Sequence, residues 1–369
     1  MDSPDLIVLS HLRWVFVWQR PQHIVSRLAA DRRTWFVEEP WPAEVDRPRL
    51  RTEDHGPVRR VWLEVPAEGR RHVGFEDAVT ATYGDLLAEA AGPCPDRVAW
   101  LYTPMALPLA RQLDPAAIVY DVMDDLASFA GAPTELRLRQ RQLLREASVV
   151  FAGGRSLHRS VSAHSTAPTH LFPSGVEPEH YERATTMPRR GTRPVAGYVG
   201  VIDERLDLEL VSDLAAALPD WEIRMIGPVL KIDEASLPRA ANITYTGPRP
   251  YEALPEVMAE LHVALMPFAL NEATRSISPT KTLEYLAAGL PVVSTRVPDV
   301  VADYEGVVDL QDDGPGFAAA CRRVKDHDPA VRARAAAPLL YRQHWDTIAR
   351  RMAAVVEAAT AGTGTEETA

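Results

Sequence analysis

This sequence of 369 residues has few cysteines, no excess of basic residues and no long apolar run. Cys94 and Cys321 lie far apart, without a CxxC partner or a histidine at metal-ligand spacing, so we predict buried thiols in a reducing compartment. The net charge of -11 argues against nucleic acid as a partner, because a phosphate backbone needs a basic face. No segment has the length of a membrane span or the basic start of a signal peptide. We therefore expect a cytoplasmic protein with at most peripheral contact with the inner face of a membrane.

Short apolar runs alternate with amphipathic segments along two stretches of the chain. In the first stretch we predict strands over Leu6–Leu9, Trp35–Val37, Val98–Leu101, Ile118–Tyr120 and Val149–Ala152. In the second we predict strands over Val195–Val199, Glu222–Ile226, Ile243–Tyr245, Val263–Met266 and Val292–Ser294. Helical patterns lie between them, over Pro21–Ala30, Glu135–Glu146, Leu208–Leu218, Thr280–Ala288 and Phe317–Lys325. This rhythm predicts an α/β protein with two doubly wound, Rossmann-like domains.

The alternation of predicted strands and helices is interrupted near residues 177–194, which contain Pro, Gly, Arg and Thr and show no periodic spacing of apolar residues. We predict a first domain over residues 1–180, a connection over 181–194 and a second domain over 195–340. A C-terminal helix over 341–360 is expected to pack back on the first domain, and 361–369 to form a disordered tail. The two domains would face each other across a cleft, with ligands outside the carboxyl ends of the strands.

The most informative segment of the second domain is SPTKTLEYLAAGLPVVST, which starts at Ser278. Its proline predicts a helix start, where the backbone N–H groups near Thr280 and the charge of Lys281 can hold a phosphate. Glu284 lies one turn further along, within reach of the ribose of a nucleotide whose phosphates sit at the helix start. This segment predicts a nucleotide-binding site.

Two glycine turns follow earlier strands of the same domain. Gly200 would let a diphosphate approach the backbone, and Arg205 is the nearest cation. Gly227 would leave room for a flat base, and Lys231 follows it. The alternative interpretation is that Arg205 is a surface residue paired with Glu204 or Asp207 and that Lys231 is a solvated lysine.

These segments resemble the retaining glycosyltransferases of family 4, also described as glycosyl transferases group 1. That family has two glutamates separated by seven residues, then a helix ending in Ala-Gly and a Pro-Val-Val strand; Glu284 matches the second glutamate. Ser276 occupies the position of the first, for which Glu272 or Asn271 would have to substitute. The segment LFPSGVEPEHY is similar to the hinge of the family.

The resemblance implies a GT-B fold and transfer of a sugar from a nucleoside diphosphate sugar to an acceptor hydroxyl, with retention at the anomeric carbon. The acceptor would be a sugar, a lipid-linked compound or a small molecule, in glycan, cell-envelope polysaccharide or glycoconjugate biosynthesis. Glu284 would bind the donor ribose. The donor is a substrate, and we expect no further cofactor. We also expect no metal, since Arg205, Lys281 and the helix start can stabilise the leaving diphosphate.

The loop after the first strand, SHLRWVFVWQRPQH, carries residues suited to a sugar acceptor. Aromatic faces cover the apolar side of a pyranose and polar groups bind its hydroxyls, so we assign acceptor binding to His11, Arg13, Trp18 and Arg20. Aromatic core packing with solvated arginines, or contact of this loop with a membrane surface, are the alternatives.

Three carboxylates follow the strand at Ile118–Tyr120 in the segment YDVMDD. Similar proteins place a catalytic or acceptor-orienting side chain here, so Asp121, Asp124 and Asp125 are the catalytic candidates, with Asp121 first. Roles as helix caps or arginine partners are open for at least two of them. A metal held by these residues would lie in the first domain, whereas the phosphate-binding features lie in the second.

Two other functions remain compatible with the sequence. A nucleotide-sugar 2-epimerase would share the architecture but need no second substrate. A non-catalytic sugar-nucleotide-binding or scaffolding protein is favoured by the missing first glutamate at Ser276. A dinucleotide-dependent dehydrogenase is disfavoured, because no GxGxxG follows the first strand.

Overall fold

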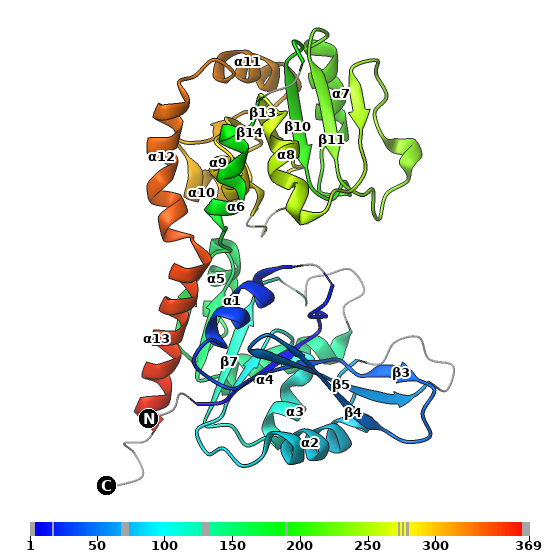
Figure 1. Ribbon diagram of the computed structural model, residues 1–369, viewed down its shortest axis with the longest axis vertical. Helices are drawn as coiled ribbons and strands as arrows, with labels where there is room; N and C mark the ends of the chain where they lie inside the picture. Colours follow the sequence, from blue (N-terminus) through cyan, green and yellow to red (C-terminus); the bar gives the residue numbers. More distant parts are fainter. Residues whose placement is uncertain are drawn as a thin grey trace. The chain divides into compact units, whose positions relative to one another are not determined.

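The computed structural model describes residues 4–16, 18–67, 74–124, 126, 133–188, 191–271, 274, 277 and 280–363 (Figure 1). The chain forms two compact units. Unit 1 runs to Pro173 and includes the segment that begins at Trp345, whereas unit 2 is Ser174–His344. The segment predicted as a connection therefore lies inside unit 2, where residues fold into helices α6 (Pro178–Glu182) and η3 (Arg183–Thr186). The C-terminal helix α13 (Trp345–Thr363) belongs to unit 1.

Unit 1 is built on a sheet whose described strands follow the order β3-β5-β2-β1-β6-β7-β8-β9, with β4 paired to β5. The strands are β1 (Leu6–Ser10), β2 (Thr34–Glu38), β3 (Trp41–Ala43), β4 (Arg49–His55), β5 (Val58–Pro66), β6 (Val98–Leu101), β7 (Ala117–Val122), β8 (Val149–Ala152) and β9 (Thr169–Leu171). The β4–β5 pair is antiparallel and the other pairs are parallel. The strand order reverses beside β1, between β2 and β6, and this makes the carboxyl end of β1 the switch point of the sheet.

Helices cover both faces of this sheet, because its central strands are apolar on both sides. Leu6 and Val8 of β1 pack in one cluster with α1 and α13, whereas Ile7 and Leu9 pack in the other. The helices of unit 1 are α1 (Arg20–Leu28), α2 (Asp77–Ala91), η1 (Pro104–Ala106), α3 (Leu107–Gln112), α4 (Thr134–Glu146), α5 (Arg155–Ser162) and α13. The ring of Trp345 on α13 stacks on His23 of α1 at 4.9 Å, so the C-terminal helix is an integral layer of unit 1.

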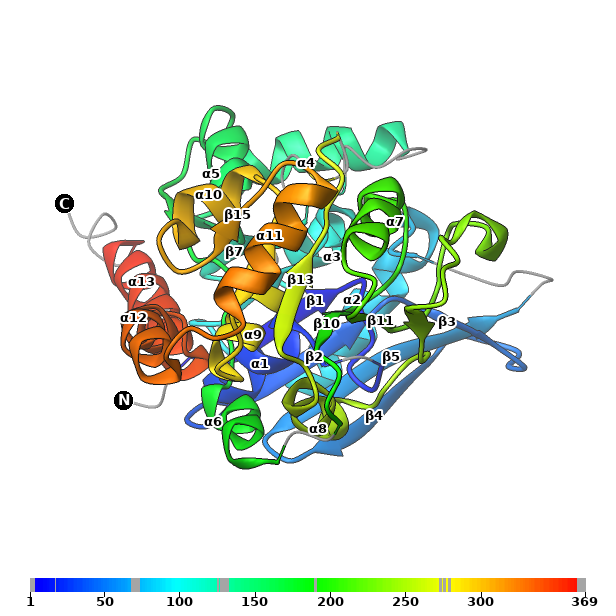
Figure 2. The same ribbon diagram turned by 90° about the horizontal axis from the view of Figure 1, so that it is seen from above.

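Unit 2 contains a smaller, parallel sheet in the order β12-β11-β10-β13-β14-β15. Its strands are β10 (Val195–Val199), β11 (Glu222–Ile226), β12 (Ile243–Tyr245), β13 (Val263–Met266), β14 (Val292–Ser294) and β15 (Asp309–Leu310). Its helices are α6, η3, α7 (Leu208–Ala217), η4 (Glu234–Ser236), η5 (Tyr251–Ala253), α8 (Leu254–Ala259), α9 (Lys281–Ala287), α10 (Pro298–Tyr304), α11 (Gly314–Val324) and α12 (Pro329–Arg342). Helices α7 and α11 lie side by side (Figures 1 and 2), and α9 packs against α6 and α12. The switch point lies beside β10, between β11 and β13.

The two segments through which the chain enters and leaves unit 2 are joined to each other. Val176 forms a parallel bridge with His344, and the Val176 N–H donates to the carbonyl of Gln343 at 2.9 Å. The imidazole Nε2 of His344 lies 3.1 Å from a Glu179 carboxylate oxygen. These contacts make the start and the end of unit 2 one local structure.

The two cysteines differ in environment. Cys321 is buried in α11, and burial raises the pKa of its thiol to about 12. Cys94 is a free thiol that is only partly buried, so the prediction of two buried thiols is wrong for this residue. Among the described residues, no helix combines the length and the apolar character that crossing a membrane requires.

Candidate functional site

The loops that follow β10 and β13 form one connected platform at the switch point of unit 2. The N–H of Asp207 donates to the carbonyl of Pro267, and the N–H of Ala269 donates to that of Arg205, both at 2.9 Å. Leu206 and Phe268 form an antiparallel bridge between the same loops. Ligands of doubly wound sheets bind at such strand ends, so this platform is the first candidate site.

Gly200 and Gly227 bring two strand ends into direct backbone contact. Gly227 has φ +146, and a Cβ added to it would lie 1.9 Å from the carbonyl oxygen of Gly200. The space that a side chain at position 227 would need is filled by the backbone of the neighbouring loop, and a base beside Gly227 stays a prediction. A Cβ at Gly200 would in turn lie 2.7 Å from the hydroxyl of Tyr198, which donates to the Val201 carbonyl. The two glycines fix the shape of the platform.

Arg205 is anchored to the platform by Asp203. Its Nε and Nη2 donate to the two carboxylate oxygens of Asp203, at 2.9 and 2.7 Å, and this pairing raises the pKa of Arg205. The Asp203 side chain is 5% exposed and that of Arg205 is 40% exposed, so the guanidinium keeps a solvent-facing side. Asp207 instead accepts from the Leu210 N–H at 2.9 Å and caps α7.

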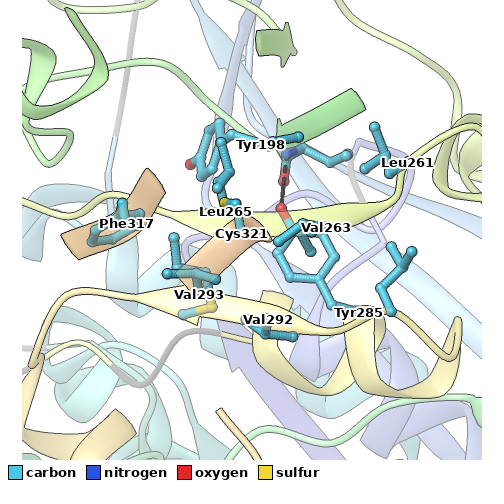
Figure 3. Close-up of a cluster of buried hydrophobic side chains, with 14 of the residues drawn as sticks. Tyr198, Leu261, Val263, Leu265, Tyr285, Val292, Val293, Phe317 and Cys321 are labelled. Atoms are coloured by element: carbon cyan, nitrogen blue, oxygen red, sulfur yellow. Dashed lines mark hydrogen bonds between the residues drawn. The ribbon is translucent and has the colours of Figure 1, made fainter. Parts of the chain in front are cut away.

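Helix α9 is attached to the end of β10 by Tyr285. The tyrosine is buried, and its hydroxyl accepts from the Val199 N–H at 2.8 Å and donates to the Val199 carbonyl at 3.3 Å (Figure 3). Gly289 follows the end of the helix with φ +70. The sequence reasoning missed Tyr285, although it directly follows Glu284; this tyrosine explains how α9 is held in register with the platform.

Glu284 lies on α9 beside this anchor. Its side chain is 14% exposed and pairs with Lys281 at 2.8 Å. Burial raises the pKa of Tyr198 at the end of β10, and the charge of Glu284 makes a smaller contribution in the same direction. The helix begins at Lys281, with Thr280 at the N-cap position. Ser278, together with Ser276 and Glu272, lies outside the described residues.

Lys231 is the remaining donor-site candidate of unit 2. It lies in the loop after β11, its backbone has φ +61, and its side chain is exposed. No hydrogen bond of its side chain is found among the described residues. Its position therefore leaves both the donor-binding and the solvated interpretations open.

Asp121 lies inside strand β7 rather than after it. The strand continues to Val122, because Asp121 pairs with Phe151 of β8 in the sheet register. The Asp121 side chain has no exposed surface, and it accepts from Nε of Arg20 at 3.1 Å and from Nη2 at 2.9 Å. Arg20 also donates to the Phe172 carbonyl at 2.7 Å, so its guanidinium joins the start of α1 to the end of β9.

This pairing changes our interpretation of two candidates. Asp121 and Arg20 are buried and bound to each other, so we interpret them as residues that fix the backbone around them rather than as residues that contact an acceptor. The pair connects β7, the start of α1 and the end of β9. Asp124 is exposed, and Asp125 lies outside the described residues.

Buried polar atoms without a hydrogen-bond partner lie at the switch point of unit 1. His11 directly follows β1, and Tyr102 directly follows β6; the buried Nδ1 of His11 has no hydrogen-bond partner among the described residues. The buried Tyr102 hydroxyl and Trp100 Nε1 make no hydrogen bond of good geometry, although Asp121 and Trp100 both act on the pKa of Tyr102 as neighbours. Burial lowers the pKa of His11, so its imidazole is neutral at pH 7. Such atoms are uncommon in folded proteins and mark places where water or a ligand supplies the missing bond. The sequence reasoning included His11 and missed Tyr102.

Arg13 and Trp18 lie on the loop between β1 and α1. Arg13 donates to Glu38 at 3.2 Å and its guanidinium lies 4.9 Å from the ring centroid of Trp41. Trp18 donates to the His23 ring at 3.1 Å and remains 46% exposed, and Phe16 is 77% exposed. The loop therefore combines a fixed arginine with exposed aromatic rings near the switch point.

Metal-ligand groups and cavities among the described residues also bear on the site. No group of three or more His, Cys, Asp or Glu side chains is placed to hold a metal ion within that part of the chain. A cavity of about 460 Å³ in unit 2 is lined by residues of β15 and α12, among them Leu310, Val331 and Arg332. None of the predicted donor-site residues lines it.

Part of unit 2 is similar to a known family of proteins. Residues 193–327, which lie within unit 2, match the family model described as Glycosyl transferases group 1. The putative teichuronic acid biosynthesis glycosyltransferase TuaH of Bacillus subtilis is 30% identical over 204 residues, which cover 52% of this chain. The match covers 50% of the length of that curated relative, so this chain corresponds to about half of it.

Solved structures resemble the chain over nearly its whole length. A trehalose-6-phosphate protein from E. coli bound to UDP-2-fluoro glucose has a TM-score of 0.68 at 14% identity, with 96% of this chain and 99% of that chain covered. HepE from Anabaena, in complex with UDP and glucose, has a TM-score of 0.70 at 14% identity over 96% and 100%. Sucrose-phosphate synthase from Thermosynechococcus elongatus has a TM-score of 0.66 at 16% identity, with 98% of this chain and 100% of that chain covered. The protein thus has the GT-B fold, and its second unit carries a region similar to the group 1 glycosyltransferases.

Proposed function

We propose that this protein is a glycosyltransferase that moves a hexosyl group from a nucleoside diphosphate sugar to an acceptor hydroxyl. The observation that carries the proposal is the coincidence of the family match with the switch-point platform of unit 2, which holds Gly200 and Arg205 and adjoins helix α9 with Glu284. The family 4 pattern around Glu284 supports retention at the anomeric carbon. The relative named for teichuronic acid biosynthesis supports a role in polysaccharide formation.

Each donor-site residue has a task in this mechanism. Glu284 accepts hydrogen bonds from the ribose, and the diphosphate lies over the Gly200 turn beside Arg205 and Lys281. Negative charge builds on the diphosphate as its bond to the anomeric carbon breaks, and the two cations stabilise that charge. Lys281 is paired with Glu284 at 2.8 Å, so the arriving diphosphate exchanges one anionic partner of this lysine for another.

Acceptor binding is assigned to unit 1. The neutral imidazole of His11 offers an unpaired ring nitrogen to an acceptor hydroxyl, and the hydroxyl of Tyr102 lies at the neighbouring strand end. Arg13 and the exposed ring of Trp18 suit the remainder of a sugar, a lipid-linked compound or a small molecule. The buried pair of Arg20 and Asp121 holds this region in place.

A thermal-shift screen with UDP-, GDP-, ADP- and dTDP-sugars tests the proposal. A donor at 100 times its Kd stabilises the native state by about 2.7 kcal/mol, so one nucleotide class should raise the melting temperature clearly. Glu284→Gln keeps the side-chain volume but removes charge-assisted hydrogen bonds worth about 1.5–3 kcal/mol, so donor affinity should fall while the fold survives. Glu256→Gln, at an exposed position on α8, is the matched control.

The outcomes separate the alternatives. Glycosyltransferase function predicts nucleoside diphosphate release that depends on an added acceptor. Conversion of the donor to an epimer without acceptor indicates a 2-epimerase, and binding without turnover over a broad acceptor panel indicates a non-catalytic binding protein. Donor affinity that is unchanged in Glu284→Gln removes the ribose assignment.

A further inference from the structure

Strand β4 forms an open margin of the sheet of unit 1 (Figure 1). It runs over the seven residues Arg49–His55 and pairs with β5 on one side, and no other described strand pairs with it. An antiparallel strand directs alternate N–H and C=O groups to its two sides, so about half of those in β4 face away from β5. None of its residues is buried. The outer edge of β4 is therefore able to pair with a further strand.

The charges of β4 do not block such pairing. The strand has equal numbers of arginines and carboxylates, and several of them are paired within the hairpin. Arg51 donates to Glu64 of β5 at 2.9 Å, and Glu53 accepts from Arg60 of β5 at 3.0 Å. The side chains of Arg51 and Glu53 are 43% and 50% exposed, so each keeps a side open to another partner.

The order of these charges makes β4 complementary to an inverted copy of itself. In antiparallel pairing centred on Thr52, Arg51 lies opposite the partner's Glu53, and Glu53 lies opposite the partner's Arg51. A two-fold axis produces this kind of reciprocal contact, in which one patch serves both copies. Moving the centre to Arg51 or to Glu53 places two like charges directly opposite each other, which is destabilising. Charge therefore selects one partner and one register.

We propose that two copies of this protein associate through β4, with the two strands antiparallel and Thr52 on the two-fold axis. The sheets of the two copies of unit 1 then continue into each other. A single pair of seven-residue strands is a small interface beside the roughly 1,200–2,000 Å² that stable complexes bury, so the dimer is reversible. This inference concerns assembly and does not depend on the proposed function.

Sedimentation equilibrium of the full chain over a wide range of protein concentration tests the assembly. The average mass should rise from that of one copy toward that of two, and added salt should weaken association because it screens exposed charge pairs. Arg51→Glu and Glu53→Arg each turn both cross-copy pairs into like-charge pairs. Each variant alone should therefore dimerise at least about 10-fold more weakly than the wild type.

Mixing the two variants distinguishes pairing between copies from damage within one copy. A copy with Arg51→Glu has two glutamates at these positions and a copy with Glu53→Arg has two arginines, so the mixed dimer regains both opposite-charge pairs. The mixture should associate much more tightly than either variant alone. Glu89→Arg, an equal charge reversal at an exposed position of α2, is the matched control and should leave dimerisation unchanged.

A cross-link tests the register. Directly opposed Cα atoms in an antiparallel pair lie about 4.5–5.5 Å apart, which is within the range of a disulfide. Thr52→Cys, in a Cys94→Ser background that removes the partly buried native thiol, should form a disulfide-linked dimer under mild oxidation. Arg49→Cys in the same background should not, because it lies opposite the partner's His55 in this register.

Each result decides for or against the interface. A wild-type protein that stays monomeric at every concentration overturns the inference. A dimer that both charge reversals leave unchanged shows that another surface is used, and it overturns the inference as well. If both variants lose association and their mixture does not regain it, charge pairing between two β4 strands is refuted. Efficient cross-linking through Arg49→Cys instead of Thr52→Cys refutes the register centred on Thr52.

Discussion

Replacing Asp121 with alanine should destabilise unit 1 strongly, because it leaves the guanidinium of Arg20 buried without its counter-charge. Arg20 is 4% exposed and makes three donor contacts to Asp121, two of them from Nε at 3.1 Å and one from Nη2 at 2.9 Å. Breaking a buried ion pair from one side costs about 3–5 kcal/mol. For a domain of this size, each kcal/mol lowers the melting temperature by about 2–4 °C, so we expect a fall of about 6–20 °C.

Thermal unfolding followed by circular dichroism measures this effect, with two controls. Asp96→Ala, at an exposed position of the same unit, should change the free energy of unfolding by less than about 0.5 kcal/mol. The double variant Arg20→Met/Asp121→Leu removes both charges, so it should recover much of the lost stability. A melting temperature of Asp121→Ala within about 2 °C of the wild type would refute the structural role and return Asp121 to the catalytic candidates.

Three further predictions concern the platform, the unit 1 switch point and metals. Gly227→Ala should weaken donor binding and lower the melting temperature, because its Cβ would lie 1.9 Å from the Gly200 carbonyl oxygen and φ is +146; equal donor affinity in calorimetry would contradict the close approach. Burial lowers the pKa of His11 from 6.5, so the unfolded chain binds its proton at a higher pH than the folded chain. The stabilising contribution is complete above pH 6.5 and is lost as the pH falls through the folded pKa. His11→Gln should flatten this loss in urea titrations between about pH 7 and 5, and an unchanged pH profile would speak against it. Donor turnover should persist after exhaustive treatment with a chelator, and a complete loss that magnesium or manganese restores would reopen Asp124 and Asp125 as ligands.

The strands and helices with strong apolar periodicity could be predicted from the sequence. The central parallel strands are continuous apolar runs because both of their faces are buried, as Leu6 to Leu9 show. Strand β4, RLRTEDH, was missed because it contains no buried residue and its pairing partner defines it. Strand β5 was missed although its apolar residues alternate and are buried, so its pattern was there to be found. Sequence patterns report burial, so an exposed strand at the margin of a sheet leaves little signal.

Those parts of the candidate site that depend on contacts between residues close in sequence were predictable. Asp207 caps α7 and Gly289 ends α9, both through contacts within a few residues. Partners that lie far apart in sequence were not predictable, because chain folding alone brings them together. The pairing of Arg20 with Asp121 spans 101 residues, and the hydroxyl of Tyr285 reaches Val199 across 86. Both long-range contacts changed the interpretation of a site residue or of its support.

Hydrogen–deuterium exchange with and without a nucleoside diphosphate tests most directly where the donor binds. We predict protection on binding in a platform segment, Gly200–Asp207, and in the adjoining helix, Lys281–Ala287. Glu284→Gln should reduce that protection at the same nucleotide concentration, because fewer molecules are occupied. Protection confined to unit 1, or to the cavity lined by residues of β15 and α12, would contradict the assignment of the donor site to the switch point of unit 2.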